Sequence, residues 1–135
     1  MAKFPSEEWV KQYVEKLNSN PDYEDAARNW EGDITFVVKG DERFAGEAYL
    51  YLDLYHGKCR GVAYAFNDSS GLKKSEFRYI GTYSNWVRLL KGEIDPIQGV
   101  LMGKFRLEGP MVKVMRYTRA AKELVRTAAM VPTEW

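Results

Sequence analysis

Hydrophobic residues recur every three or four positions at the start of the chain, which predicts two amphipathic helices. Ser6 is suited to cap the first helix, and its apolar side comprises Trp9, Val10, Tyr13, Val14 and Leu17. Pro21 is typical of a first helical turn and predicts a second, shorter helix over residues 22–29. Its apolar side is formed by Tyr23, Ala26, Ala27 and Trp30.

The pattern then changes to alternation, which predicts four consecutive strands. They cover residues 32–39, 48–55 and 60–66 and a segment around Phe77 and Tyr79. Helical spacing returns in a helix capped by Ser84 and closed by Gly92, and in a short helix that starts at Asp95-Pro96 and contains Leu101.

The last part of the chain predicts one strand and one long helix. Residues 104–108 alternate again, and Gly109-Pro110 then precedes a stretch of about twenty residues that ends near Pro132. Alternation places the apolar residues of each strand on one face, and we expect that face to be buried. A slip of one residue in the strand register would expose the whole apolar set. That set is Ile34, Phe36, Leu50, Leu52, Leu54, Val62, Tyr64, Phe66, Phe77, Tyr79, Phe105 and Leu107.

Consecutive strands joined by short turns favour an antiparallel sheet, whose apolar face needs a covering layer. We therefore predict an α+β fold: a five-stranded, mostly antiparallel sheet covered on one face by helices. The length of 135 residues predicts one domain over 1–135.

Composition narrows the function classes. Twenty Lys and Arg against nineteen Asp and Glu give a net charge of +1, which gives no indication of a nucleic-acid partner. Aromatic residues reach 14% and must be housed in a core or around a ligand. Cys59 is the sole cysteine and no apolar leader opens the chain, so we expect a cytoplasmic protein without a disulfide.

Candidate metal and catalytic groups are few. His56 and Cys59 are the only residues of their types, whereas a zinc site needs three or four ligands. We therefore expect no metal, no cofactor and no catalytic constellation.

One polar set leaves an enzymatic alternative open. Strand alternation places Asp53 on one face with Tyr51 and Tyr55, where an acid beside phenols could transfer protons in a ketosteroid isomerase-like cone. A solvated outer sheet face is the favoured interpretation, because the opposite face already carries Leu50, Leu52 and Leu54.

The predicted final helix has an uneven apolar stripe. Its members are Met111, Val114, Met115, Thr118, Ala121, Val125, Ala128 and Ala129. Methionines suit a surface that accepts varied shapes, although core filling explains them better when they are taken alone. The small residues bury little area, so we expect the distal half of this helix to open as a lid.

Three arginines flank this stripe, namely Arg116, Arg119 and Arg126. They would suit a peripheral contact with an anionic membrane or a lipid head group. A solvated basic face paired with acids elsewhere explains them equally well.

A longer ordered pattern covers residues 77–109. A strand leads into a capped helix ending at Gly92, then an acidic turn with Pro96, another short helix, and the segment Gly103-Lys104-Phe105-Arg106-Leu107-Glu108-Gly109. This pattern resembles the SCP-2 (sterol carrier protein 2) sterol-binding domain family, and the element order along nearly the whole chain agrees. The strand over residues 48–55 departs from the family in its aromatic content.

The resemblance implies an apolar tunnel between sheet and helices that holds sterols, fatty acids or fatty acyl-CoA, in carriers usually without catalysis. We therefore expect non-catalytic lipid binding and transfer, and a small protein-interaction module stays open as a third interpretation. The residues expected to contact lipid are Phe36, Leu52, Phe66, Trp86, Leu90, Leu101, Phe105, Met111 and Met115. The oligomeric state is not predicted.

Overall fold

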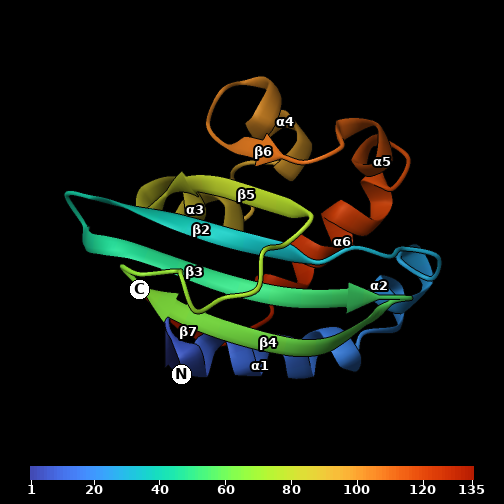
Figure 1. Ribbon diagram of the computed structural model, residues 1–135, viewed down its shortest axis with the longest axis horizontal. Helices are drawn as coiled ribbons and strands as arrows, with labels where there is room; N and C mark the ends of the chain where they lie inside the picture. Colours follow the sequence, from blue (N-terminus) through green and yellow to red (C-terminus); the bar gives the residue numbers. More distant parts are fainter.

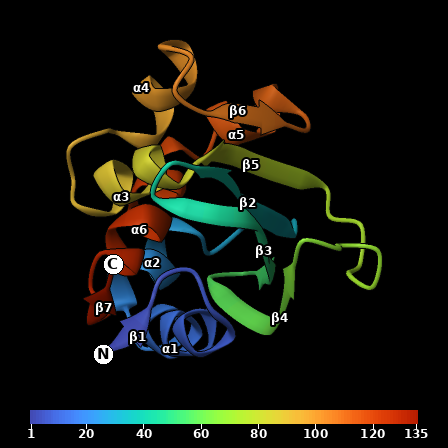
Figure 2. The same ribbon diagram turned by 90° about the vertical axis from the view of Figure 1, so that its left-hand side faces the viewer.

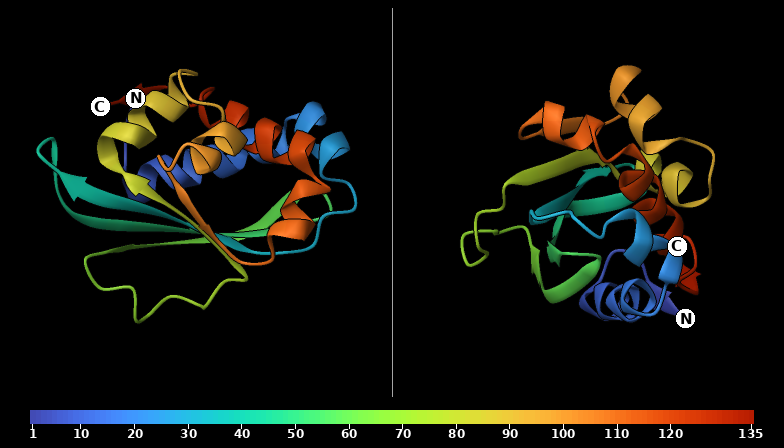
Figure 3. Two further views of the ribbon diagram at one scale, coloured as in Figure 1. Left: turned by 90° about the horizontal axis from the view of Figure 1, so that it is seen from above. Right: turned by 90° about the vertical axis from the view of Figure 1, so that its right-hand side faces the viewer.

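The computed structural model describes residues 1–135 and places a five-stranded sheet under a layer of helices (Figure 1). Seen from above in Figure 3, the helices all lie on one side of the curved sheet. The predicted α+β fold class is therefore confirmed.

Six helices and seven strands make up the chain. The helices are α1 (Glu7–Asn18), α2 (Pro21–Ala26), α3 (Tyr83–Leu90), α4 (Pro96–Leu101), α5 (Met111–Met115) and α6 (Thr118–Ala128). The strands are β1 (Ala2–Lys3), β2 (Ile34–Asp41), β3 (Phe44–Tyr55), β4 (Lys58–Phe66), β5 (Phe77–Thr82), β6 (Arg106–Glu108) and β7 (Thr133–Glu134).

The strand order in the main sheet is β4-β3-β2-β5-β6, and only the β2–β5 pair is parallel. The sheet is therefore mixed but mostly antiparallel, as predicted. A separate parallel pair joins β1 to β7, so the two ends of the chain lie side by side (Figure 2).

Helix caps follow the predictions with one exception. Ser6 Oγ accepts a hydrogen bond from the Trp9 amide at 3.0 Å, and Asp95 accepts from Ile97 and Gln98. Ser84 does not cap α3. Thr82 takes that role, since its hydroxyl accepts from the Asn85 amide at 3.2 Å and the helix starts two residues earlier.

The predicted buried face of the sheet is confirmed except at one position. Eleven of the twelve side chains expected there are buried or pack against the main core. The prediction that Phe66 is buried is wrong. Its side chain is 48% exposed at the end of the edge strand β4, where its ring contacts the ring of Phe44.

The opposite sheet face is less exposed than expected. Tyr49 and Tyr51 are buried. The connection over residues 67–76 crosses this face (Figure 3, left) and packs Leu72 against the cluster that contains Tyr49. The Tyr51 hydroxyl donates to Asp33 at 2.7 Å. Tyr49 therefore belongs, with Val37 and Ile80, to a second, smaller core.

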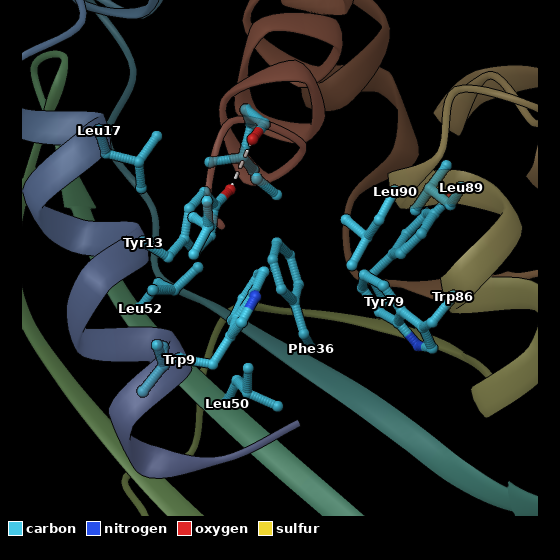
Figure 4. Packing of buried hydrophobic residues seen from close by; sticks show 14 of the residues in the cluster. Trp9, Tyr13, Leu17, Phe36, Leu50, Leu52, Tyr79, Trp86, Leu89 and Leu90 are labelled. Carbon is cyan, nitrogen blue, oxygen red and sulfur yellow. Dashed lines mark hydrogen bonds between the residues drawn. The ribbon is translucent and has the colours of Figure 1, made fainter. Parts of the chain in front are cut away.

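Helix α1 packs its aromatic side between the sheet and α6. Trp9, Tyr13 and Leu17 are fully buried beside Leu50 and Leu52 (Figure 4). The Tyr13 hydroxyl donates to the Leu124 carbonyl at 2.6 Å, so a buried hydrogen bond fixes α1 to α6.

The single long final helix predicted from the sequence is wrong, because the chain breaks it into α5 and α6. Tyr117 leaves the helical conformation, with φ −125° and ψ 39°. Its ring packs edge-on against Trp30 at 5.2 Å and its hydroxyl donates to the Asn29 carbonyl. These contacts outweigh the propensity of the local sequence to continue one helix.

The close contact at Gly81 gives a test of this packing. A Cβ atom there would lie 2.4 Å from the Phe105 ring, which is itself stacked on Tyr79. We expect Gly81→Ala to lower the free energy of unfolding by about 1–3 kcal/mol through overpacking. Urea unfolding measures this. Gly71→Ala is the matched control, because nothing lies within 4 Å of its added methyl group. Equal stability of the two variants would contradict the packing described.

Candidate functional site

An apolar pocket lies between the sheet and the helices α4, α5 and α6. It encloses about 100 Å³, and no charged side chain lines it. The lining residues are Tyr23, Trp30, Ile34, Phe36, Leu54, Phe77, Tyr79, Pro96, Ile97, Val100, Leu101, Leu107, Met111, Val114, Met115, Tyr117, Ala120, Ala121, Leu124 and Val125.

Exposure distinguishes an inner end from a mouth. Tyr23, Phe36, Leu54 and Leu124 are buried and form the inner end. At the mouth Leu101 of α4 is 71% exposed, and Met111 and Met115 of α5 are also exposed. Helices α4 and α5 lie at one edge of the molecule in Figures 1 and 2, so the mouth is there.

Aromatic contacts fix the α4 side of the pocket. Tyr79 stacks on Phe105 with ring centroids 4.7 Å apart, and its hydroxyl donates to the Pro96 carbonyl at 2.7 Å. Burial, with a smaller contribution from Asp95, raises the pKa of Tyr79, so this donor keeps its proton at neutral pH. The first turn of α4 is thereby held to β5.

Helix α5 is held by few contacts. None of its residues is buried and no side chain caps it. Lys113 provides the main tether: its ammonium pairs with Glu76 at 3.0 Å, donates to the Glu31 carbonyl and lies over the Trp30 ring. The mobile element expected at the pocket is therefore α5.

The expected lid in the distal half of the final helix is wrong. Leu124, Thr127 and Ala128 are buried, and Asn20 donates to the Thr127 hydroxyl at 2.8 Å. The break at Tyr117 turns α6 so that Ala120 and Leu124, outside the predicted stripe, face the core.

Four of the nine residues expected to contact lipid line the pocket, namely Phe36, Leu101, Met111 and Met115. The other five do not. Leu52, Trp86, Leu90 and Phe105 are buried in the packed core, and Phe66 is exposed at the far edge of the sheet. All five belong to the same sheet face or the same helix layer as the residues that line the pocket. That face and that layer extend beyond the pocket.

Sequence reasoning missed several lining residues at the inner end. The sequence pattern assigns Tyr23 and Trp30 only to the apolar side of a short helix, although both reach the pocket. Ala120 and Leu124 were missed because the pattern predicts one continuous helix. The helical spacing of apolar residues that starts again at Tyr117 and continues through Ala120 and Leu124 is the sequence signal that indicates these two residues.

The polar set around Asp53 does not form a catalytic cone. Asp53 pairs with Arg60 at 3.3 Å, Tyr55 stacks on His56, and Tyr51 donates to Asp33. None of these residues lines the pocket. No group of three or more His, Cys, Asp and Glu side chains is placed to hold a metal ion.

The three arginines expected at a membrane differ in their partners. Arg119 pairs with Asp25 at 3.0 Å and Arg126 pairs with Glu123 at 3.3 Å. Arg116, directly after α5, is exposed and forms no ion pair. It is therefore the one of the three whose charge is available beside the mouth. None of the helices has the length and apolarity needed to cross a bilayer.

Comparisons with protein families and with solved structures agree with each other. The chain matches the model of the SCP-2 sterol transfer family over residues 10–122. A crystal structure of sterol carrier protein 2 superposes with a TM-score of 0.87 and 30% identity, covering 96% of this chain and 99% of that one. No curated protein sequence matches the chain.

Two further solved structures share the fold. The solution structure of protein TT1886 from Thermus thermophilus has a TM-score of 0.87 and 28% identity, with 99% of this chain and 93% of that chain covered. The apo sterol carrier protein 2 of Yarrowia lipolytica has a TM-score of 0.60 and 15% identity, with 96% of this chain and 95% of that chain covered. The last of these is a likeness of fold alone.

The weak attachment of α5 predicts a gradient of hydrogen exchange along the end of the chain. We expect amides of residues 113–117 to exchange much faster than those of residues 121–128, because α5 buries no side chain while α6 is fixed by Tyr13 and Asn20. Exchange followed by mass spectrometry measures the difference. Equal protection of the two helices would exclude α5 as the mobile element.

Proposed function

The chain belongs to the SCP-2 sterol transfer family, and we propose that it binds single lipids in the α4–α6 pocket and transfers them without catalysis. The observation that carries this proposal is a pocket between sheet and helices without any charged lining residue. Such a site provides burial for a hydrocarbon and no group for acid–base chemistry.

Burial of hydrocarbon supplies the binding energy. Each buried methylene contributes about 0.8 kcal/mol to the free energy of binding. Lipids with acyl chains and lipids with sterol rings can therefore both bind to the same apolar walls. The cavity of about 100 Å³ is small for such ligands, since a cavity of about 150 Å³ holds a benzene molecule. A lipid must therefore widen the pocket, and displacement of α5 is the movement with the fewest contacts to break.

The mouth has the properties of a membrane contact. Leu101, Met102 and Val112 are each about two-thirds exposed or more, and Arg116 adds an unpaired positive charge beside them. Apolar side chains that reach the acyl boundary together with a cation suit an anionic bilayer surface. We place the lipid tail of a fatty acid or fatty acyl-CoA inside and its charged head at this mouth. The one cysteine is buried and free, in keeping with the proposed cytoplasmic location.

Quenching of tryptophan emission by a dibrominated stearic acid tests the site. Trp30 lines the pocket, whereas Trp9, Trp86 and Trp135 do not. Bromine quenches only at short range, so we expect Trp30→Phe to lose most of the quenching seen in the parent protein. A fluorescence titration measures it.

Trp135→Phe is the matched control for this titration, because Trp135 is partly exposed near the C-terminus. It should keep the quenching of the parent. Undiminished quenching in Trp30→Phe would place the lipid elsewhere, and absence of quenching in the parent would refute the proposed function.

Replacing Arg116 tests the membrane contact. A charge near an anionic surface contributes about 1 kcal/mol, so Arg116→Gln should slow lipid transfer to phosphatidylserine vesicles roughly fivefold. Transfer to phosphatidylcholine vesicles should stay unchanged. A fluorescent-lipid transfer assay with both vesicle types measures the two rates.

Arg126→Gln is the control for this assay, because Arg126 lies at the other end of α6 and is paired with Glu123. It should transfer lipid like the parent protein. Equal slowing in both variants would show a dependence on net charge and would remove the assigned role of the mouth.

A further inference from the structure

Tyr23 lines the inner end of the apolar pocket, and its hydroxyl forms no hydrogen bond within the protein. We propose that Tyr23 Oη donates a hydrogen bond to an uncharged oxygen on the buried end of the ligand, so that the pocket selects lipid alcohols and ketones inserted oxygen first. This inference rests on the proposed lipid site and adds the orientation and chemical class of its ligand.

Tyr23 is held firmly in place. Its side chain is 2% exposed, in the first turn of α2, where Pro21 and the Asn20 cap fix the backbone. Asn20 also donates to the Thr127 hydroxyl of α6 at 2.8 Å. The phenol is therefore positioned before any ligand arrives, which lowers the entropy lost when a hydrogen bond forms.

The other phenols near the pocket already have partners. Tyr13 donates to Leu124, Tyr79 to Pro96 and Tyr117 to Asn29, each to a backbone carbonyl. The Tyr23 hydroxyl forms no hydrogen bond, and the only fully enclosed side-chain polar atom without a partner is Ser84 Oγ. The Tyr23 oxygen is thus not sealed in the core, and the pocket is the cavity that its side chain lines, so we infer that the hydroxyl faces this cavity.

The electrostatics of the inner end determine which oxygen fits. Burial raises the pKa of Tyr23, so the group stays a neutral O–H donor at neutral pH. With no charged side chain in the lining, a carboxylate at the inner end would be a buried charge without a counter-ion, which is strongly unfavourable. A fatty acid therefore inserts its tail first, whereas an alcohol or ketone satisfies the phenol.

A pair of fluorescent polyene lipids tests the inference: parinaryl alcohol and parinaric acid. Tyr23→Phe removes the hydroxyl and nothing else, so we expect the affinity for the alcohol to fall about 2- to 10-fold, the loss of one hydrogen bond. The affinity for the acid should change much less, so the ratio of the two dissociation constants shifts. Fluorescence titrations of parent and variant measure both constants.

Two controls separate a lost contact from a structural effect. Thermal unfolding of Tyr23→Phe should match or exceed that of the parent protein, because no internal hydrogen bond is lost. Tyr49→Phe removes a phenol that lies on the opposite face of the sheet, donates a hydrogen bond to Glu47 and does not line the pocket, and it should keep the alcohol-to-acid ratio of the parent.

The outcomes distinguish this inference from the proposed function. An unchanged ratio in Tyr23→Phe, with both lipids bound, would overturn the Tyr23 contact and leave lipid binding standing. Failure of the parent protein to bind either lipid would overturn both.

Discussion

The break between α5 and α6 is the feature on which the pocket depends. Tyr117 leaves the helix so that its ring can pack against Trp30 and its hydroxyl can reach Asn29. As a result Ala120 and Leu124 face the core, while Met111 and Met115 lie over the mouth. One continuous helix would present a different set of side chains to the sheet and would fix α5 as firmly as α6.

The helix layer is solid at one end and hollow at the other. Around α1 and α3, large rings fill the space under the layer: Trp9, Tyr13, Phe36 and Trp86 contact one another in sequence (Figure 4). Over β5 and β6, the covering helices α4 and α5 have six and five residues and bury almost nothing. Stability is thus concentrated away from the pocket, and the pocket walls remain free to adapt.

Much of the fold was predictable because alternation and helical spacing are local signals. The strands, the buried face of the sheet and the caps Ser6 and Asp95 follow from neighbouring residues alone. The break at Tyr117 was not predictable in that way, because its partner Trp30 is distant in the sequence. The burial of Tyr49 depends likewise on where residues 67–76 cross the sheet.

The candidate site was predictable only in part for the same reason. Apolar character identifies the layer between sheet and helices, but it does not distinguish Leu52 and Trp86, which fill the core, from Leu54 and Trp30, which line the pocket. That distinction depends on the lengths of α4 and α5 and on the direction of α6, which are properties of the assembled molecule.

A crystal structure with a dibrominated stearic acid bound tests most directly that this pocket holds lipid and that α5 opens it. Anomalous scattering from bromine locates the ligand without reference to the protein density. We predict bromine peaks between Trp30 and Leu124, with α5 displaced from the sheet and α6 unmoved. Bromine outside the space between β5 and α6, or a filled pocket with α5 in its present place, would contradict this interpretation.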